Sequence, residues 1–592
     1  MAITGWIHPK RDLRDERPAV NAMTVALTAG TLRRDVVRLA RHAAFAHLGL
    51  ASGYADWRHP ERPDPDLVLV IDGQLTNRGH LDEQLYGRAR PLSADAEVLL
   101  HAYRTWGPGL VDRIDGAYAI AIWDNLARQL LLIRDPLGAR TLFFTLVDGG
   151  IIFATRATAL LAHPQVKPVI DADGLNELLT LGPVRTPGHG VLDEVAEVLP
   201  AEIIQAGADG LRRRSYWYLE ADDPRPDAAT AVQVVRQALA ETTAAHRTRP
   251  AGAVLLSRGI ASGAAAVYAA GTSGHRPAAW TLALTGPQDP PADGGADVDQ
   301  AERVAEQLRL RHDVFAIDTD TLLDTAHAAR EALDFPCEAG TDAVLLAGLR
   351  RIAAAGSTSV VTGDGANAVF GGYRWLHEPL TLATDDFPWP GVGDPAELLN
   401  ADARRHLMPG VYRRHRYEQA TLGVPHQAGA DALARRRRTM AYLTLTRYVP
   451  YLLTRLGQLA DAAGVTLRTP FADWLLAAYL FNTPTGLRHL LGIPNGLLRH
   501  AVAGVLPDET IWLRPRQFPS ADLLHGWQQT RLDQLRDVLT DREAPLRPLL
   551  DRDRVTDLVT RPAGPGGERG TATVGYLLDV NAWLQRHHIS LT

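Results

Sequence analysis

The first 218 residues carry short apolar runs separated by turn residues, a pattern typical of strands. Apolar residues between positions 94 and 106 take helical spacing instead. We therefore predict an N-terminal α+β antiparallel sandwich with flanking helices. The clearest predicted strands are residues 67–71, 117–123, 129–134, 141–146 and 150–154.

The second half alternates apolar strand-like runs with Ala- and Leu-rich stretches of helical spacing. This alternation predicts an α/β doubly wound parallel sheet, in which ligands bind at the carboxyl ends of the strands. After Tyr373 the pattern becomes mainly helical, which predicts a helical C-terminal extension. The Asp- and Pro-rich segment 219–227 indicates a linker, so we expect two domains, 1–218 and 219–592. The predicted strands are 253–256, 278–284, 312–317 and 359–361, and the predicted helices are 228–246, 301–308, 319–333 and 342–354.

One strand-to-helix turn in the second half has the composition of an anion-binding loop. Residues 252–256 are mostly apolar, residues 257–263 are rich in Ser and Gly, and an alanine-rich helix follows. Small residues at such a turn let backbone N–H groups approach an anion, and the helix N-terminus favours its charge. Ser257, Gly259 and Ser262 are therefore candidate contacts for a nucleotide phosphate. From the turn alone, an ordinary strand-to-helix connection is an equally good interpretation.

Residues 257–262, Ser-Arg-Gly-Ile-Ala-Ser, resemble the Ser-Gly-Gly-x-Asp-Ser pyrophosphate loop of ATP pyrophosphatases. Residues 360–373 read Val-Val-Thr-Gly-Asp-Gly-Ala-Asn-Ala-Val-Phe-Gly-Gly-Tyr and resemble the second signature of asparagine synthetase. Two such turns in this order, with similar flanking sequence, extend the resemblance over nearly the whole chain. Asparagine synthetase, β-lactam and carbapenam synthetases and lasso-peptide cyclases share this architecture. The lysine-poor composition suits the natural-product branches, so lasso cyclases and β-lactam synthetases are the nearest expected types.

The first half resembles a class II glutaminase domain. The similar segments are Asp72-Gly73 with the residues that follow, 94–99, 115–124 and 134–138. The last two match most closely and are mainly structural, because they combine alternating core residues with a Pro-Gly turn.

Three replacements in this half predict that it does not hydrolyse glutamine. The chemistry implied by the resemblance needs an N-terminal cysteine, but Met1 is followed by Ala2 and no cysteine precedes Cys337. Residues 46–50 lack the family's carboxylate-binding arginine. Asp72 replaces an oxyanion-hole asparagine, and its charge would repel a developing oxyanion. For Asp95, we expect a surface carboxylate in preference to an amine-binding group.

The resemblance implies that a carboxylate is activated as an acyl-adenylate and then converted to an amide. Mg²⁺ must neutralise the pyrophosphate, and the family holds it with carboxylates from both turns. Those positions are Ala261 and Asn367 here, and the acid that follows the second one is Ala368. Arg258 replaces a loop glycine, and its charge could partly substitute for a metal. The sequence therefore predicts no complete metal site.

The resemblance also implies a late lysine that stabilises charge during acyl transfer. Its position is Arg516, which keeps the charge without the compact ammonium group, and an upstream family lysine appears as Asn495. Lys10 and Lys167 are the only lysines of the chain, and both lie in the first half. Asp364 stays as a candidate general base and Gly363 as a candidate nucleotide contact. The alternatives are that Asp364 caps a helix and that Arg516 pairs with a surface acid.

Composition narrows the range of partners. A formal charge of -6 over 592 residues indicates neither nucleic acid nor an anionic membrane as a partner. No run of apolar residues is long enough for a membrane span, and a single cysteine excludes an intrachain disulfide, so we expect a cytoplasmic protein. His47, His312 and His500 form no zinc-binding pattern. For the arginine run 435–438, a solvated helix face is favoured over ligand contact.

Two functions are compatible with these residues. One is an ATP- and Mg²⁺-dependent amide-forming ligase of lasso-peptide type, acting on a peptide or a small carboxylate. The other is a catalytically silent homologue without cofactors, which scaffolds or regulates an active homologous enzyme or holds a peptide. The lost acids and lysine favour the second function, whereas the whole-length resemblance favours the first.

Overall fold

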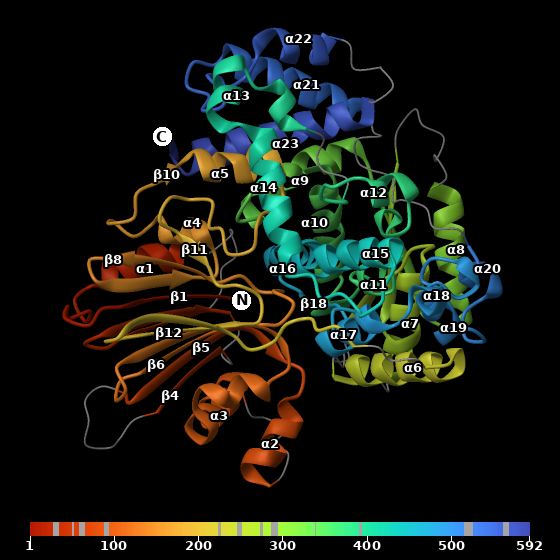
Figure 1. Ribbon diagram of the computed structural model, residues 1–592, viewed down its shortest axis with the longest axis horizontal. Coiled ribbons are helices and arrows are strands. Elements are labelled where there is room, and N and C mark those ends of the chain that lie inside the picture. The colour runs from red at the N-terminus through yellow and green to blue at the C-terminus, as the bar shows by residue number, and fades with distance from the viewer. Residues whose placement is uncertain are drawn as a thin grey trace. The chain divides into compact units, whose positions relative to one another are not determined.

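The computed structural model describes residues 1–27, 35–49, 53–57, 65–87, 94–222, 226–245, 252–272, 276–285, 294–337, 339–389, 394–513, 525–560 and 567–592. These residues form two compact units, whose elements are labelled in Figure 1. The first unit comprises Met1–Glu177, Arg185–Tyr218 and Arg586–Thr592, and the second unit comprises Leu178–Val184 and Leu219–Gln585.

The first unit contains two six-stranded antiparallel sheets and one short parallel strand pair. One sheet has the order β11 (Ala196–Glu197), β8 (Phe143–Val147), β9 (Gly150–Ala154), β1 (Ala2–Ile7), β3 (Ala43–Leu48) and β2 (Asp35–Leu39). The other has the order β13 (Gly210–Ser215), β12 (Glu202–Gly207), β7 (Gln129–Arg134), β6 (Gly116–Asp124), β5 (Leu67–Leu75) and β4 (Tyr54–Trp57). The short pair is β10 (Val169–Ile170) with β19 (Ser590–Leu591).

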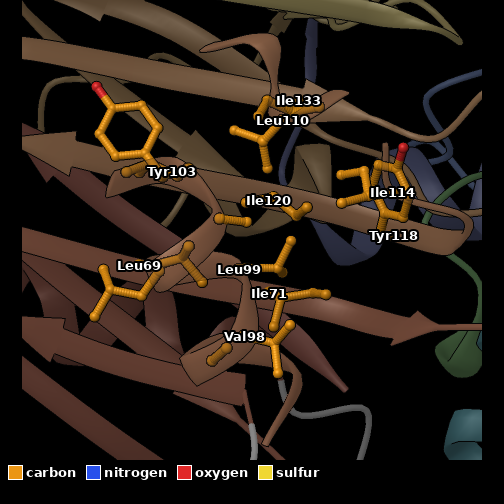
Figure 2. Packing of buried hydrophobic residues seen from close by; sticks show 14 of the residues in the cluster. Leu69, Ile71, Val98, Leu99, Tyr103, Leu110, Ile114, Tyr118, Ile120 and Ile133 are labelled. Atoms are coloured by element: carbon orange, nitrogen blue, oxygen red, sulfur yellow. The ribbon is translucent and has the colours of Figure 1, made fainter. Parts of the chain in front are cut away.

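Strand β5 explains the layers of the first unit. Its successive residues face opposite sides of the sheet, so Leu69 and Ile71 join one core while Val70 joins another. The first core packs against α3 (Asp95–Trp106). Figure 2 shows Leu69 and Ile71 of β5 together with Val98 and Leu99 of α3. The second core lies between the two sheets, and α1 (Arg17–Ala26) packs on the sheet that contains β1.

The second unit is built on a five-stranded parallel sheet. Its order is β16 (His312–Ile317), β15 (Ala278–Leu284), β14 (Gly252–Leu255), β17 (Ser359–Val361) and β18 (Thr466–Arg468). The chain proceeds from β14 outward to β16 and returns on the other side of β14 as β17. The topological switch point therefore lies between β14 and β17, where doubly wound sheets bind ligands.

Helices cover both faces of this sheet. The face that buries Trp280 and Val360 carries α9 (Thr319–Ala332), α10 (Ala339–Ala354) and α16 (Val449–Ala463). Helices α7 (Ile260–Thr272) and α8 (Gly294–Gln307) also pack on the strands, and α6 (Ala228–Ala245) packs on α7. The other helices are α2 (Arg78–Tyr86), α4 (Ala157–Leu160), α5 (Ala172–Asn176), α11 (Ala366–Val369), α12 (Pro379–Ala383), α13 (Ala401–Leu407), α14 (Pro409–Leu422), α15 (Ala432–Leu443), α17 (Trp474–Asn482), α18 (Thr485–Arg488), α19 (Gly496–Ala501), α20 (Asp508–Ile511), α21 (His525–Thr540), α22 (Arg552–Thr560) and α23 (Gly567–Arg586).

The predicted α/β class, with an antiparallel sandwich before a doubly wound sheet, is confirmed, and every predicted strand is present. The sequence placed some element ends less well. Helix α8 begins at Gly294, ahead of the predicted start at residue 301, because the Gly, Ala and Asp residues of its first turns carry no apolar stripe.

Candidate functional site

The two motif turns lie side by side at the switch point of the second unit. Strands β14 and β17 pair in parallel with Val254 opposite Val361, so both turns leave the sheet at the same edge. A Cβ atom on Gly363 would lie 2.6 Å from the backbone nitrogen of Ser262 and 2.8 Å from the backbone oxygen of Ala261. Glycine is therefore what permits this approach, and it brings the predicted nucleotide contacts Gly363 and Ser262 together.

Hydrogen bonds between Ser257 and Ser262 close the first turn on itself. Their Oγ atoms lie 2.9 Å apart, and Ser262 Oγ also accepts the backbone N–H of Ser257 at 3.1 Å. Ser257 Oγ accepts the backbone N–H of Gly259 at 3.2 Å. The three residues predicted to contact phosphate are thus engaged with one another, and a phosphate would have to displace these bonds.

Arg258 is paired with an acid beside the first turn. Its Nη1 donates a hydrogen bond to Oδ1 of Asp297 at 3.0 Å, and Asp297 lies in the first turn of α8. The carboxylate balances the guanidinium charge. Arg258 therefore does not supply the uncompensated positive charge that would substitute for a metal ion.

Asp364 is the acid that the second turn retains. Its carboxylate accepts a hydrogen bond from the Thr362 hydroxyl, which in turn accepts the Asp364 backbone N–H at 2.9 Å. Burial raises the pKa of Asp364, although the Thr362 hydrogen bond and the charge of Arg455 act in the opposite direction. A raised pKa suits a proton-accepting group. The capping alternative is wrong, because the N-cap of α11 is Gly365 and no side chain caps this helix.

Asn367 and Asn495 form a hydrogen-bonded amide pair at the second turn. Nδ2 of Asn495 donates to Oδ1 of Asn367 at 2.8 Å, and Asn495 is only 2% exposed. Gly372 packs against both amides, so that a Cβ atom there would clash with each of them. These are the positions at which the resemblance places an acid and a lysine, so a neutral pair replaces two charged groups.

Comparison with known proteins identifies the lineage. The family model for asparagine synthase matches residues 234–585, more than half of the chain, and the model for a glutamine amidotransferase domain matches residues 2–217. The chain belongs to the asparagine synthase family. The family predicted from the two turns is therefore confirmed.

The curated relatives of this asparagine synthase family member include bacterial and fungal proteins. Asparagine synthetase (glutamine-hydrolyzing) 3 of Bacillus subtilis (strain 168) is 27% identical over 620 residues, covering 100% of this chain and 99% of that protein. A putative asparagine synthetase (glutamine-hydrolyzing) of Mycobacterium tuberculosis (strain ATCC 25618 / H37Rv) is 26% identical over 518 residues, covering 78% and 76%. Amidase chyE of Penicillium rubens is 23% identical over 539 residues, covering 78% and 79%.

The side chains at the two turns of this family member do not make a set of charged ligands for Mg²⁺, because Asp364 alone offers a carboxylate that is not held by an arginine, and it accepts a hydrogen bond from Thr362. The ion prefers charged oxygen ligands, yet Ala261 offers no oxygen from its side chain. The Asn367 oxygen is uncharged and already accepts an N–H of Asn495, and the carboxylate of Asp297 is paired with Arg258. Within the described ranges, no group of three or more His, Cys, Asp or Glu side chains could hold a metal ion.

The late lysine that the resemblance implies has no counterpart among the described residues of the second unit. Lys10 and Lys167 both belong to the first unit. Arg516 lies outside the described residues, so its predicted catalytic role stays a prediction.

Among the described helices, none combines the length and apolar character needed to cross a membrane.

Asp72, which replaces the asparagine expected from the resemblance, is a buried carboxylate whose Oδ1 lies 3.5 Å from Nη1 of Arg140. The expectation of a surface carboxylate at Asp95 is wrong. Its side chain is largely buried, and Oδ2 accepts the backbone N–H of Leu75 at 3.0 Å. The reason is tertiary: α3 begins against the end of β5, so Asp95 joins the two elements.

The arginine run 435–438 is not a solvated face. Arg435 is exposed, but Arg436 donates to the carbonyl of Leu382 at 2.8 Å and to the hydroxyl of Tyr417 at 2.6 Å. Arg438 is buried and donates to the carbonyl of Phe481 at 3.1 Å. Helix α15 packs against α12, α14 and α17, so its arginines meet carbonyl groups of these neighbours.

Several residues at the second turn were missed by sequence reasoning. His489 donates from Nε2 to the carbonyl of Gly371 at 3.0 Å, and the buried Arg488 precedes it in the chain. No local pattern distinguishes either residue from a surface residue at the end of a short helix. Gly372 could have been found from the sequence, because it belongs to the Gly-Gly-Tyr end of the second motif.

Proposed function

We propose that this member of the asparagine synthase family has lost Mg²⁺-dependent ATP cleavage and works as a binding partner. The observation that carries the proposal is the Asn367–Asn495 amide pair, which stands where the family resemblance places an acid and a lysine. An exchange of one residue would leave a charge without its partner. The exchange of both leaves an uncharged hydrogen bond, although Oδ1 of Asn495 is buried without a partner among the described residues.

The surroundings of the pair support the proposal. The charge of Arg258 is already balanced by Asp297, and Ser257 and Ser262 are bonded to each other. These contacts complete the turn without a ligand. The partner would be an active homologous enzyme that the protein scaffolds or regulates, or a peptide that it holds, in a natural-product pathway of lasso-peptide type.

A second function is an active amide-forming ligase, in which an amine captures an adenylated carboxylate. The observation that favours it is the close approach of the two turns at Gly363, together with an acid at Asp364 whose pKa is raised. In this function Asp364 accepts the proton of the attacking amine and Arg516 stabilises the developing charge. ATP and Mg²⁺ would then be required.

Pyrophosphate release separates the two functions. Purified full-length protein is incubated with ATP, Mg²⁺ and a synthetic precursor peptide that carries a free carboxylate, and pyrophosphate is measured. The proposal expects no release and no micromolar Mg·ATP binding by calorimetry. Release of pyrophosphate, or Mg·ATP binding that Asp364→Ala abolishes, would instead establish the ligase.

A restored variant provides the positive control. The combined change Ala261→Asp, Asn367→Asp and Asn495→Lys returns both acids and the lysine together, because the structure shows that positions 367 and 495 touch. Asn495 has a positive φ of 57°, which costs a lysine about 1 kcal/mol or more, so folding is checked first by circular dichroism. ATP binding gained by this variant alone would show that the rest of the pocket is retained.

The partner half has its own test. The protein is added to an active amide-forming enzyme of the same family, and the amide-forming rate of that enzyme is measured. The proposal expects a rate that changes saturably with the amount of added protein. An unchanged rate, together with no binding of the precursor peptide, would refute the partner role.

A further inference from the structure

Arg488 is a buried cation without an acidic partner. It ends α18, is 8% exposed, and its Nε has no hydrogen-bond partner. Within the described residues its guanidinium makes one hydrogen bond, from Nη2 to the Thr485 hydroxyl at 3.4 Å, a long distance for such a contact. Among the described residues, no carboxylate forms an ion pair with it.

The charges of two guanidinium groups on α15 (Ala432–Leu443) act on Arg488, and α15 packs against α17 (Trp474–Asn482), which ends three residues before α18. Burial, together with the positive charges of Arg438 and Arg437 on α15, lowers the pKa of Arg488 to about 10. The Nε of Arg437 is also buried without a hydrogen-bond partner. Neither of these two arginines forms an ion pair with a carboxylate within the described ranges. In the described part of the chain, no acid forms an ion pair with any of these three arginines, so none balances their charges.

This arginine cluster, defined as Arg437, Arg438 and Arg488, borders the second motif turn. His489 follows Arg488 and donates from Nε2 to the carbonyl of Gly371 at 3.0 Å. Burial and the charge of Arg488 lower the pKa of His489 to about 4, so this imidazole adds no charge at neutral pH. The His377 ring lies 5.7 Å from the His489 ring, and its Nδ1 is buried without a hydrogen-bond partner.

A buried guanidinium needs compensation, because it keeps its proton at neutral pH and loses its hydration. Folded proteins provide a carboxylate or several carbonyl oxygens. Arg438 has the second kind, with acceptors at Phe481, Asn482 and Glu220. In the described part of the chain, Arg488 has neither, and the same holds for Arg437, which is half-buried with a buried Nε. The neighbouring acid Glu378 is held by Arg374 at 2.8 Å.

We propose that Arg488 and Arg437 bind an oxyanion, the carboxylate or phosphate group of a ligand, beside the second motif turn. The planar donor fork of arginine matches both groups bidentately. Arg438 orients the site through its carbonyl contacts. The site goes beyond the proposed function, because it holds whether or not the protein cleaves ATP, and its failure would leave that proposal standing.

The test compares Arg488→Met and Arg437→Met with a control, Arg435→Met, on the exposed end of the same run. Each full-length protein is titrated with sodium phosphate and, separately, with sodium succinate at constant ionic strength. Binding is followed by calorimetry and by the change in melting temperature. Methionine keeps much of the apolar bulk of arginine without its charge.

We expect saturable binding to the unaltered protein and to Arg435→Met. Arg488→Met and Arg437→Met should weaken binding at least about tenfold, since a hydrogen bond to a charged group is lost. Without ligand, Arg488→Met should melt at a higher temperature, because an uncompensated buried charge is removed. Tighter binding of phosphate assigns a phosphate ligand, and tighter binding of succinate assigns a carboxylate ligand.

Two results would overturn the site. One is the absence of saturable binding of either anion to the unaltered protein. The other is a lower melting temperature for Arg488→Met with unchanged anion binding, which is the behaviour of a purely structural arginine. If Arg488→Met does not fold, the proposal is tested on Arg437→Met alone. An anion dissociation constant equal to that of the unaltered protein would then refute the proposal.

Discussion

At the two turns, single residues differ from those that the family resemblance implies. Ala261 and Asn367 lack the charges that a dication needs, and Asn367 is committed to Asn495. Asn495 and Asn367 stand where the resemblance implies a lysine and an acid, and these two positions are in contact. Their amide pair packs against Gly372.

Gly363→Ala should destabilise the second unit. The added Cβ would lie 2.6 Å from the backbone of both Ala261 and Ser262, where no flexible side chain can move away. Overpacking of this kind costs about 1–3 kcal/mol. Urea unfolding should show the loss, and nucleotide titration should show any effect on ligand binding.

Gly271→Ala is the matched control for that change. Gly271 lies in α7, its φ is not positive, and a Cβ atom added there would meet no heavy atom within 4 Å. Alanine favours a helix over glycine by about 0.5–1 kcal/mol, so stability should stay equal or rise. A similar loss in both variants would contradict the close approach of the two turns.

His163 should make the first unit sensitive to acid. Burial lowers its pKa from 6.5 to about 4, and its ring packs edge-on against Trp6 with centroids 4.5 Å apart. The unfolded chain therefore binds a proton more readily than the folded chain below pH 6.5. The stabilising contribution is complete above that pH and is lost as the pH falls toward 4.

Urea unfolding at pH 7 and pH 5 measures this effect. We expect His163 to account for about 1–2 kcal/mol of the stability lost between the two values. His163→Leu should reduce the pH dependence by that amount, with His80→Leu as an exposed control. An equal pH dependence in all three proteins would show that His163 is not buried in its neutral form.

At the scale of elements, one arginine joins three segments of the second unit. Arg438 of α15 donates to Phe481 and Asn482 of α17, and to Glu220 in the segment before α6. Its guanidinium also stacks on the Phe481 ring, with Cζ 3.9 Å from the centroid. The arginine run is therefore a structural connection as well as a source of charge.

Arg438→Lys should destabilise the second unit by about 2–4 kcal/mol. Lysine keeps the charge but cannot reach several separate acceptors or stack as a plane, so a buried charge is left poorly compensated. Arg435→Lys, on the exposed start of the run, should stay within about 0.5 kcal/mol of the unaltered protein. Chemical denaturation compares the two variants, and equal stabilities would rule out the connecting role.

At the scale of the whole molecule, the chain order does not follow the two units. Residues 178–184 lie within the first half of the sequence but belong to the second unit, and Arg586–Thr592 return to the first. In the first unit, β19 pairs with β10, and the backbone N–H of Ser590 donates to the carbonyl of Pro168 at 2.8 Å. The last strand therefore completes a unit that begins at the first residue.

Ser590→Pro should loosen this strand pair. Proline removes the N–H that bonds to Pro168, at a cost of about 1–3 kcal/mol. Hydrogen–deuterium exchange of the β10 amides should become faster. Ser590 is exposed, and Ser590→Ala keeps its backbone N–H. In this variant the β10 amides should therefore exchange at the same rate as in the unaltered protein. Equal exchange in the proline variant would show that the pair contributes no protection.

Much of the fold was determined by the sequence alone. Strands β5, β6 and β7 follow from alternating apolar residues, and the strand–helix alternation predicts the parallel sheet, because these signals are local. The two turns were also found from sequence, since each is a short motif whose small residues serve a backbone approach. Asp364, Gly363 and the three residues of the first turn were located in this way.

Only the tertiary structure decided which of these residues meet. The contact between Asn367 and Asn495 spans 128 positions, and the pairing of Arg258 with Asp297 spans 39, so no local pattern encodes either. The same holds for Asp95, Arg438 and Arg488, whose burial depends on the elements packed against them. The sequence gives the type of each side chain. Whether its charge is compensated depends on the neighbours that folding brings into contact with it.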